Sequence, residues 1–441
     1  MVIDLAIVAG AVGLSYASGE WIGDAPLWPK IIALCGLTVF SVYLTDLYKV
    51  DLRPNGRELI VRLGLALGCA AILTAAVGFA VPLLRFGRLA FIEIFAFVTS
   101  GLVVWRLGWD RLRSTPRLSK RVLVVGVSPV AHELVALEST GLQPFSVLGF
   151  LDSDPAAPDH VPAGTVLLGK PNDLLSLVEE LHPDLVLVAL PDMRGALPTG
   201  DLLECRLRGI RVEDWPTFYE KQTGKVLVTG LRPSWLIFSD GFVKTQLLQT
   251  IKRGLDIVLA LAAMVISFPV MVLVAVAIKL DSAGPALFRQ ERVGQNGRIF
   301  VLNKFRSMRV DAEKHSGPVW ARAADPRVTR VGRFIRKTRL DELPQLVNVL
   351  VGDMSFVGPR PERPDFVRVL QKQIPFYTGR LAVKPGITGW AQVRYQYAAS
   401  VEDQLEKLQY DLYYVKNLSP FLDLIILLHT VQVVLFARGG R

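Results

Sequence analysis

The sequence predicts a membrane protein in three parts: a four-helix transmembrane unit, a parallel α/β domain, and a small α+β domain with a re-entrant membrane helix and interfacial helices. Apolar residues make up 51% of the 441 residues, and the mean hydropathy of +0.37 is high for a soluble protein. Apolar stretches fill the first quarter, and one more follows residue 252. Between them, strand-like and helix-like segments alternate. We predict domain boundaries at 1–110, 118–250 and 251–441.

The first part contains four apolar stretches, at roughly 2–18, 31–47, 59–83 and 88–108. The loops between them predict the orientation. The 19–30 loop is acidic, whereas Lys49, Arg53 and Arg57 follow the second stretch and a basic segment follows the fourth. By the positive-inside rule, both ends of this unit lie in the cytoplasm.

The middle part has the pattern of a Rossmann-like domain. Residues 121–126 form a buried strand that ends in a glycine turn, and 129–140 form a helix. Further strands are expected near 146–151, 165–168, 184–190 and 210–213, with a helix over 172–181. The first turn reads Gly-Val-Ser-Pro-Val-Ala, not G-x-G-x-x-G, so a pyrophosphate site is not encoded. We favour a cofactor-free structural or regulatory domain over a dinucleotide site.

The third part opens on an apolar run over 257–278, between Lys252-Arg253 and Lys279. Pro269 lies within the run, where it removes a backbone hydrogen bond. Both flanks are basic, and a complete span would export the basic domain that follows. We therefore predict a re-entrant helix over 254–279, bent near Ser267 and Pro269; the alternative is a proline-kinked fifth span.

A second apolar segment lies near the C-terminus, over 420–436, and is interrupted by Asp423 and His429. It predicts an interfacial or docking helix. The alternative is a core helix of the third domain.

The charge of +10 is unevenly distributed. From Lys252 onward there are 28 lysines and arginines against 16 acids, while the first 251 residues hold 22 against 24. Nucleic-acid-binding motifs are absent, so lipid headgroups and phosphates are the expected partners, and nucleic acid is not. The three cysteines indicate a reducing compartment, and neither they nor the five histidines have the spacing of a zinc site.

Two adjacent carboxylates, Asp341 and Glu342, stand at a predicted helix start. Pro344 fits the first turn of that helix and Gly352 its end. By itself, such a pair only stabilises a helix. Here cations recur around it, and arginine forks with a lysine suit a diphosphate. In a strand, Lys304 and Arg306 would share one face. The recurring cations also include Arg333 and Arg336; those that we assign to the substrate are Arg289, Arg292, Arg306, Arg339 and Arg360.

The blocks FRQERVG, NKFRSM, RLDELPQLVNVLVGDMSFVGPRPE, KPGITGWAQV and YDLYYVKN, in this order, resemble the bacterial sugar transferase family. The resemblance covers about 252–417, and the first 250 residues match the larger members in layout only. It implies a polyprenyl-phosphate hexose-1-phosphate transferase. Such an enzyme moves a sugar 1-phosphate from a UDP-sugar to undecaprenyl phosphate and releases UMP, as the initiating step of exopolysaccharide or other surface-glycan synthesis.

The resemblance also implies residue roles. Asp341 would be the nucleophile that carries the sugar phosphate, Glu342 its partner, and both would lie at a magnesium ion. The remaining roles are two essential groups, Lys304 and Asp411; a phosphate-side pair, Arg360 and Pro361; and a membrane anchor with a helix break, Lys252, Arg253, Ser267 and Pro269. Phe268 separates the last two, which departs from the family's Ser-Pro. For Trp390, packing is at least as plausible as uridine contact.

The family implies a location at the bacterial inner membrane, with the Rossmann-like and catalytic domains facing the cytoplasm, and a homodimer. Glucose and galactose are the leading sugars, and acetamido sugars stay open. Two other functions remain as alternatives. One is a nucleotide-sugar dehydratase or epimerase, against which the missing G-x-G-x-x-G and Tyr-x-x-x-Lys count; the other is a non-catalytic scaffold.

Overall fold

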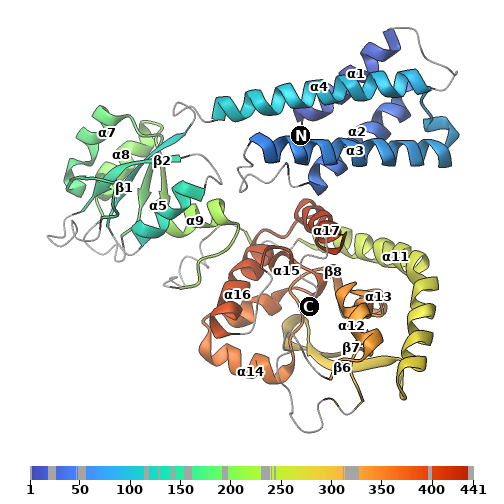
Figure 1. Cartoon of the computed structure of the whole chain (residues 1–441). Helices are drawn as coiled ribbons and strands as arrows, with labels where there is room; N and C mark the ends of the chain where they lie inside the picture. Colours follow the sequence, from blue (N-terminus) through green and yellow to red (C-terminus); the bar gives the residue numbers. More distant parts are fainter. Residues whose placement is uncertain are drawn as a thin grey trace. The chain divides into compact units, whose positions relative to one another are not determined.

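The computed structural model divides into two compact units, Met1–Phe218 and Tyr219–Arg441, which are described separately (Figure 1). The residues that the structure describes are 2–17, 26–45, 47, 56–113, 119–127, 130–140, 145–152, 161–190, 197–229, 239, 241–242, 245–310, 312, 327–395 and 400–435. The loop charges Glu20, Asp24, Lys49 and Arg53, which predicted the orientation, lie outside these residues.

Four helices occupy the positions of the four apolar stretches: α1 (Val2–Ala17), α2 (Leu27–Leu44), α3 (Gly56–Ala80) and α4 (Arg88–Arg113), with a 3-10 turn at Pro82–Leu84. They pack around a shared core that includes Val8, Leu34, Leu63 and Ile94. Leu63–Ala80 and Arg88–Gly108 are long and apolar enough to cross a membrane, whereas α1 and α2 are shorter. Membrane association is therefore supported, and a unit of four crossings stays a prediction.

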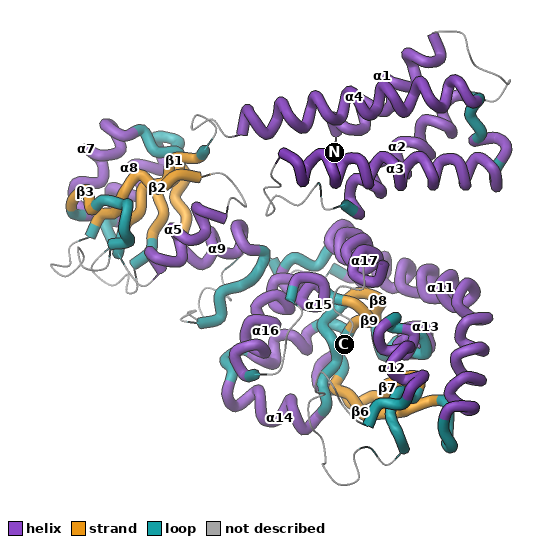
Figure 2. Tube along the Cα trace, in the orientation of Figure 1, coloured by secondary structure: helices purple, strands orange, loops and turns teal. Residues whose placement is uncertain are grey.

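The middle domain is a five-stranded parallel sheet in the order β3-β2-β1-β4-β5, which confirms the predicted parallel α/β fold. Figure 2 shows helices on both faces of the sheet. The strands are β1 (Lys120–Val125), β2 (Phe145–Leu151), β3 (Leu167–Gly169), β4 (Leu185–Val188) and β5 (Arg211–Asp214). The helices are α5 (Val130–Thr140), α7 (Leu174–Leu181), α8 (Thr199–Leu207) and α9 (Trp215–Thr223), with a 3-10 turn at Pro171–Asp173.

The turn after β1 is tied to the end of the neighbouring strand β2. Gly126 has φ +103°, as the glycine turn requires. The next backbone N–H, that of Val127, donates a hydrogen bond to the carboxylate of Asp152 at the end of β2. A carboxylate thus accepts from the backbone of the turn that follows β1.

The second unit has the predicted α+β composition. It contains α11 (Gln246–Asp281), α12 (Arg330–Lys337), α13 (Gln345–Val351), α14 (Pro364–Gln373), α15 (Trp390–Arg394), α16 (Val401–Lys416) and α17 (Pro420–Leu435). Its 3-10 turns are η4 (Gln295–Gly297), η5 (Leu340–Glu342) and η6 (Tyr377–Ala382). Strands β6 (Leu287–Val293) and β7 (Ile299–Phe305) form an antiparallel hairpin, and β8 (Ser355–Val357) pairs in parallel with β9 (Gly386–Thr388).

Helix α11 packs along both of its halves on the same domain. Ala260, in the first half, is buried against Leu346 and Val349 of α13. Val274 and Ile278, in the second half, are buried in another cluster of this domain. The helix contains Pro269 without interruption, and it changes direction along its course (Figure 1). Both halves of α11 therefore rest on the same domain, but the helix is also long and apolar enough to cross a membrane, and the re-entrant path stays a prediction.

The outer face of α11 is apolar and exposed; it includes Val265, Ile266, Phe268 and Leu273, and more than a third of each side chain is accessible. Helix α17 combines a buried face with exposed Phe421 and Leu424. This pattern fits a helix that docks on the domain and faces a lipid surface.

The base of α11 is fixed to the domain by charged side chains. Lys252 Nζ lies 2.6 Å from Asp423 Oδ2 and donates to the Val357 carbonyl, 3.1 Å away. Arg253 donates to the carbonyls of Val349 and Leu350 at the C-terminal end of α13, over 2.6 and 2.8 Å. Because helix-end carbonyls need partners, Arg253 caps α13 from the membrane helix.

We expect Arg253→Ala to lower the unfolding temperature, because it leaves these half-buried carbonyls without their donor. The loss should be about 1–3 kcal/mol, measured by thermal unfolding in detergent or nanodiscs. Arg368→Ala is the matched control: its side chain is 70% exposed and pairs only with a neighbour on its own helix, Asp365. Equal unfolding temperatures for the two variants would contradict the capping role.

Candidate active site

The carboxylate pair is set by a left-handed turn between two helices. Thr329 caps α12 by accepting from the N–H of Gly332, 2.9 Å away. Arg339 then adopts φ +58°, so the chain turns into η5, which contains Asp341 and Glu342. The predicted end at Gly352 is confirmed, with φ +103°. Pro344 is the N-cap of α13 and not part of its first turn, so the helix starts later than predicted. Asp341 and Glu342 lie before it, on the 3-10 turn η5.

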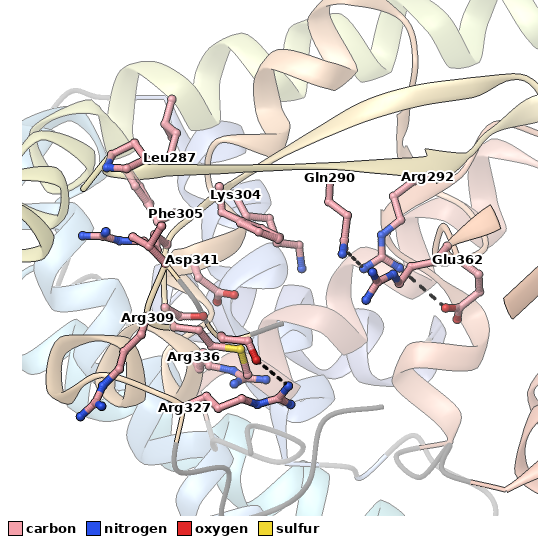
Figure 3. Close-up of a pocket in the computed structure, with 18 of the residues that line it drawn as sticks. Leu287, Gln290, Arg292, Lys304, Phe305, Arg309, Arg327, Arg336, Asp341 and Glu362 are labelled. Carbon is pink, nitrogen blue, oxygen red and sulfur yellow. Dashed lines mark hydrogen bonds and ion pairs between the residues drawn. The ribbon is translucent and has the colours of Figure 1, made fainter. Parts of the chain in front are cut away.

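Asp341 faces a cavity of about 400 Å³, and eight of the twenty residues that line it are cations (Figure 3). The β6–β7 hairpin supplies one wall, where Gln290, Arg292 and Lys304 lie. The cations that line the cavity are Arg292, Lys304, Arg306, Arg309, Arg327, Arg336, Arg360 and Arg363. Against these eight, the lining contributes two carboxylates, Asp341 and Glu362. The cavity therefore suits a ligand with several negative charges.

Glu342 is held as an anion by three cations. Its Oε1 lies 2.9 Å from Arg360, 3.2 Å from Lys304 and 3.6 Å from Arg339. Burial opposes ionisation, but these three charges outweigh it and hold the pKa of Glu342 well below its usual range. Glu342 thus fixes the direction of two cations that line the cavity.

Asp341 is in the opposite situation. Burial raises the pKa of its carboxyl, and the adjacent charge of Glu342 raises it further, while Lys304 and Arg360 act against both. A carboxylate that is disfavoured by burial gains more from forming a bond to an electrophile than one held by cations. The two carboxylates therefore differ in environment: three cations hold Glu342 as an anion, whereas burial disfavours the ionised form of Asp341.

The structure brings together Asp341, Lys304, Arg292, Arg306 and Arg360 from the predicted set. Lys304 and Arg306 both line the cavity, but Phe305 between them lines it too and Arg306 lies beyond the end of β7, so a shared strand face is not what brings them together. Arg306 also donates to the carbonyl and the hydroxyl of Ser282, over 2.8 and 3.0 Å, so it also secures the turn after α11.

The other predicted residues lie elsewhere. Arg289 is exposed on β6, and Pro361 contributes its carbonyl to Arg292 over 3.0 Å. Trp390 is buried, stacks on Tyr413 and donates to the Gly224 carbonyl over 2.7 Å, which supports packing. Asp411 is 1% exposed and paired with Arg380, outside the cavity lining.

Several lining residues were not predicted from the sequence. Glu362 and Arg363 directly follow the GPRP block, and their position there could have indicated them. Arg309 and Arg327, which are far apart in the sequence, are joined by a backbone hydrogen bond of 3.0 Å and the Met308–Val328 bridge. No local pattern in the sequence encodes that contact.

A second, smaller cavity of about 180 Å³ lies on the Glu342 side of the pair. Its lining is mostly apolar: Ala263 comes from α11, Phe356 from β8, Ile387 from β9 and Val433 from α17. Arg339 and Glu342 supply its charged end. The two carboxylates of the pair therefore line different cavities.

The residues of the site fit a magnesium ion only if a bound substrate supplies further oxygen ligands. Within the described part of the chain, no group of three or more His, Cys, Asp or Glu could hold a metal. Asp341 offers a carboxylate to the cavity, and Glu342 already meets three cations. Because Mg²⁺ is often held by one or two carboxylates together with substrate phosphates, an ion that arrives with a diphosphate matches this donor set.

Fold and site together define a membrane-associated protein whose second unit contains a cavity rich in cations beside a buried carboxylate. The family model described as "Bacterial sugar transferase" matches residues 247–437, and that described as "CoA-binding domain" matches 39–196. A UDP-glucose:undecaprenyl-phosphate glucose-1-phosphate transferase of Xanthomonas campestris pv. campestris is 30% identical over 98% of this chain and 92% of its own length. The chain belongs to the bacterial sugar transferase family, which confirms the resemblance of its sequence blocks.

Other relatives match over a smaller part of their length. A UDP-N-acetylgalactosamine-undecaprenyl-phosphate N-acetylgalactosaminephosphotransferase of Aeromonas hydrophila is 45% identical over 54% of this chain and 56% of its own. An undecaprenyl-phosphate glucose phosphotransferase of Komagataeibacter xylinus is 33% identical over 79% of this chain and 66% of its own. The chain thus spans between half and two thirds of these two relatives.

Proposed function

We propose that this protein transfers a sugar 1-phosphate from a UDP-sugar to undecaprenyl phosphate, with release of UMP. The transfer would be the initiating membrane step of exopolysaccharide or other surface-glycan synthesis. One observation carries the proposal: Asp341 faces a cavity with eight lining cations, beside a glutamate that is already neutralised. The three relatives named above are transferases or phosphotransferases whose names include undecaprenyl phosphate.

The reaction proceeds in two displacements. Asp341 Oδ attacks the sugar-bearing phosphorus, the bond from that phosphorus to the bridging oxygen breaks, and UMP leaves with the electron pair. A phosphate oxygen of undecaprenyl phosphate then attacks the same phosphorus, and the Asp341 carboxylate is released. In each displacement the attacking and leaving groups lie on opposite sides of the phosphorus. The acceptor therefore approaches from the side that UMP has left, and both occupy the same cationic cavity.

The lining cations and magnesium stabilise negative charge on the diphosphate. Lys304 and Arg360, held by Glu342, face the diphosphate and stabilise charge that develops on its oxygens. Magnesium, bound at Asp341 with Glu342 beside it, would neutralise part of the diphosphate charge.

The test of this function is UMP release over a panel of UDP-sugars, with and without undecaprenyl phosphate. The panel contains UDP-glucose, UDP-galactose and their acetamido counterparts, because the relatives' names include both glucose and N-acetylgalactosamine. We expect magnesium-dependent UMP release from one of them. No release from any, with the acceptor present, would contradict the function.

The activity should fall in acid at a pH above the usual range of an aspartate, because the attacking Asp341 must be ionised and its pKa is raised. Glu342→Gln removes one of the two causes of that increase. The acidic limb of its residual activity should therefore move to lower pH than in the wild type. The measurement is a pH profile of UMP release, with the exposed Glu402→Gln as control; an unmoved limb in Glu342→Gln would contradict the coupling.

The membrane arrangement follows from the path of α11. Since both halves of the helix pack on the catalytic domain, α11 enters the cytoplasmic leaflet of the inner membrane, bends at Pro269 and returns. Its apolar outer face meets acyl chains, and the cavity lies at the headgroup level where the acceptor phosphate is found. Both folded domains then face the cytoplasm.

This topology predicts that Arg298→Cys, in a variant without the native cysteines, reacts with a membrane-impermeant maleimide only after the inner membrane is opened. Arg298 is exposed at the turn of the β6–β7 hairpin. Arg85→Cys, between α3 and α4, is the control that should react in cells whose outer membrane alone is permeable. Labelling of Arg298→Cys under that same condition would exclude the re-entrant path.

A further inference from the structure

A cluster of buried charges lies outside both cavities, on η6 and α16. Arg380 and Asp411 are 3% and 1% exposed, and their closest atoms are 2.8 Å apart. Arg380 also donates to the hydroxyl of Tyr377 over 2.8 Å. None of these three residues lines either cavity beside the carboxylate pair. The cluster therefore does not contact a ligand in those cavities.

The cluster reaches the site through the main chain. Arg380 Nη2 donates to the Arg360 carbonyl over 2.9 Å. The side chain of the same Arg360 lies in the cationic cavity and donates to Glu342 Oε1 over 2.9 Å. One residue thus connects the buried ion pair to the carboxylate pair.

Each of the two residues that follow Arg360 also has a cation as its partner. The Pro361 carbonyl accepts from Arg292 over 3.0 Å. Glu362 pairs with Lys407 of α16 over 2.7 Å. Burial opposes the ionisation of Glu362, but Lys407 and Arg380 outweigh it and lower the pKa of this carboxyl to about 2. Cations therefore hold three consecutive residues, 360 to 362, and two of these cations come from elements behind the cavity.

Stability alone does not account for this arrangement. Charges removed from water are costly, and apolar residues of equal volume often serve a fold as well as a buried ion pair does. A pair that directs one carbonyl has a specific effect: it fixes the backbone from which the Arg360 guanidinium extends. An error of about 1 Å at such a position can reduce a rate by about 10²-fold.

We propose that Arg380 is a positioning residue of the transfer reaction, which Asp411 holds in place and which acts through the main chain of Arg360. This inference rests on the proposed function and assigns Asp411 to positioning, apart from the reacting atoms. Asp411 and Arg380 contact neither the diphosphate nor the acceptor.

The test is a double-mutant cycle of Arg380→Met and Arg360→Ala, read as kcat/KM for UMP release. Each single variant should lose about 10²-fold. If Arg380 acts through Arg360, the double variant should be within about threefold of Arg360→Ala alone. Losses that multiply to about 10⁴-fold would overturn the proposal, and so would full activity of Arg380→Met. Arg380→Lys should recover part of the activity.

Lys225→Met is the matched control, because Lys225 also pairs with α16, at Glu406 over 2.6 Å, without contact to residues 360–362. A second readout does not need turnover: amide hydrogen exchange across 358–363 should be faster in Arg380→Met than in Lys225→Met. Equal exchange in the two variants would overturn the positioning role, even if no UDP-sugar were a substrate. A wild-type protein without UMP release would contradict the proposed function instead.

Discussion

Asp341→Asn should lose about 10⁴-fold or more of the UMP-releasing activity, since an amide cannot form the bond to phosphorus and the residual rate depends on the cations alone. The substitution keeps the size of the side chain, so the cavity should still bind the UDP-sugar. Binding of UDP measured by calorimetry should therefore be retained while UMP release is lost.

Asp353→Asn is the matched control for this variant. Asp353 follows α13, on the same segment as the pair, and lines neither cavity beside it. Its activity should equal that of the wild type. Wild-type activity in Asp341→Asn would remove the nucleophile from the mechanism, and equal losses in both variants would indicate a folding defect.

Lys304→Met should reduce UMP release by about 10²–10³-fold, because it removes a preorganised charge from the cavity and one of the three cations at Glu342. Burial lowers the pKa of Lys304, although Glu342 acts against this effect. The wild type should therefore lose activity as the pH rises toward the usual range of lysine, when the ammonium group deprotonates. That basic limb should be absent from the residual activity of Lys304→Met.

Lys337→Met is the control, since Lys337 is exposed at the end of α12 and lines neither cavity beside the pair. It should leave both the rate and the pH profile unchanged. A Lys304→Met protein with the wild-type rate would show that the cavity does not use this charge.

The parts of the fold that the sequence predicts are those with a local cause. Alternation of buried strands and helices identifies the parallel sheet, and alternating apolar and basic residues indicate a strand where β7 lies, whereas its pairing with β6 was not predicted. Pro344 and Gly352 predict the limits of α13. The helices α8 and α9 were not predicted; α8 buries only Leu202 and Cys205 and has no strong apolar stripe.

The rest of the site depends on contacts between distant segments. Asp411 is recognisable as a residue of the YDLYY block, but its partner Arg380 is on another element, and a sequence cannot show that the pair supports Arg360. Arg309 and Arg327 are far apart in the sequence and meet only through the fold. Arg253 was predicted as a membrane anchor, and in the structure it caps the helix that follows the carboxylate pair. Such roles arise from packing, which single-residue patterns do not encode.

The same distinction applies to the membrane helix. Its apolar composition and Pro269 are visible in the sequence, but the choice between a span and a re-entrant helix depends on where its two halves pack. Ala260 and Ile278 lie in separate clusters of one domain. These contacts support the proposed re-entrant path, because a straight helix across the membrane would expose one of the two clusters.

The central claim is that Asp341 carries the sugar phosphate, and mass spectrometry of the protein tests it most directly. The protein is mixed with magnesium and the UDP-sugar that the panel identifies, without acceptor, quenched and digested. The account predicts a peptide containing Asp341 that is heavier by one sugar phosphate, lost on addition of undecaprenyl phosphate and absent from Asp341→Asn. An active protein that forms product without any such adduct would contradict the covalent mechanism.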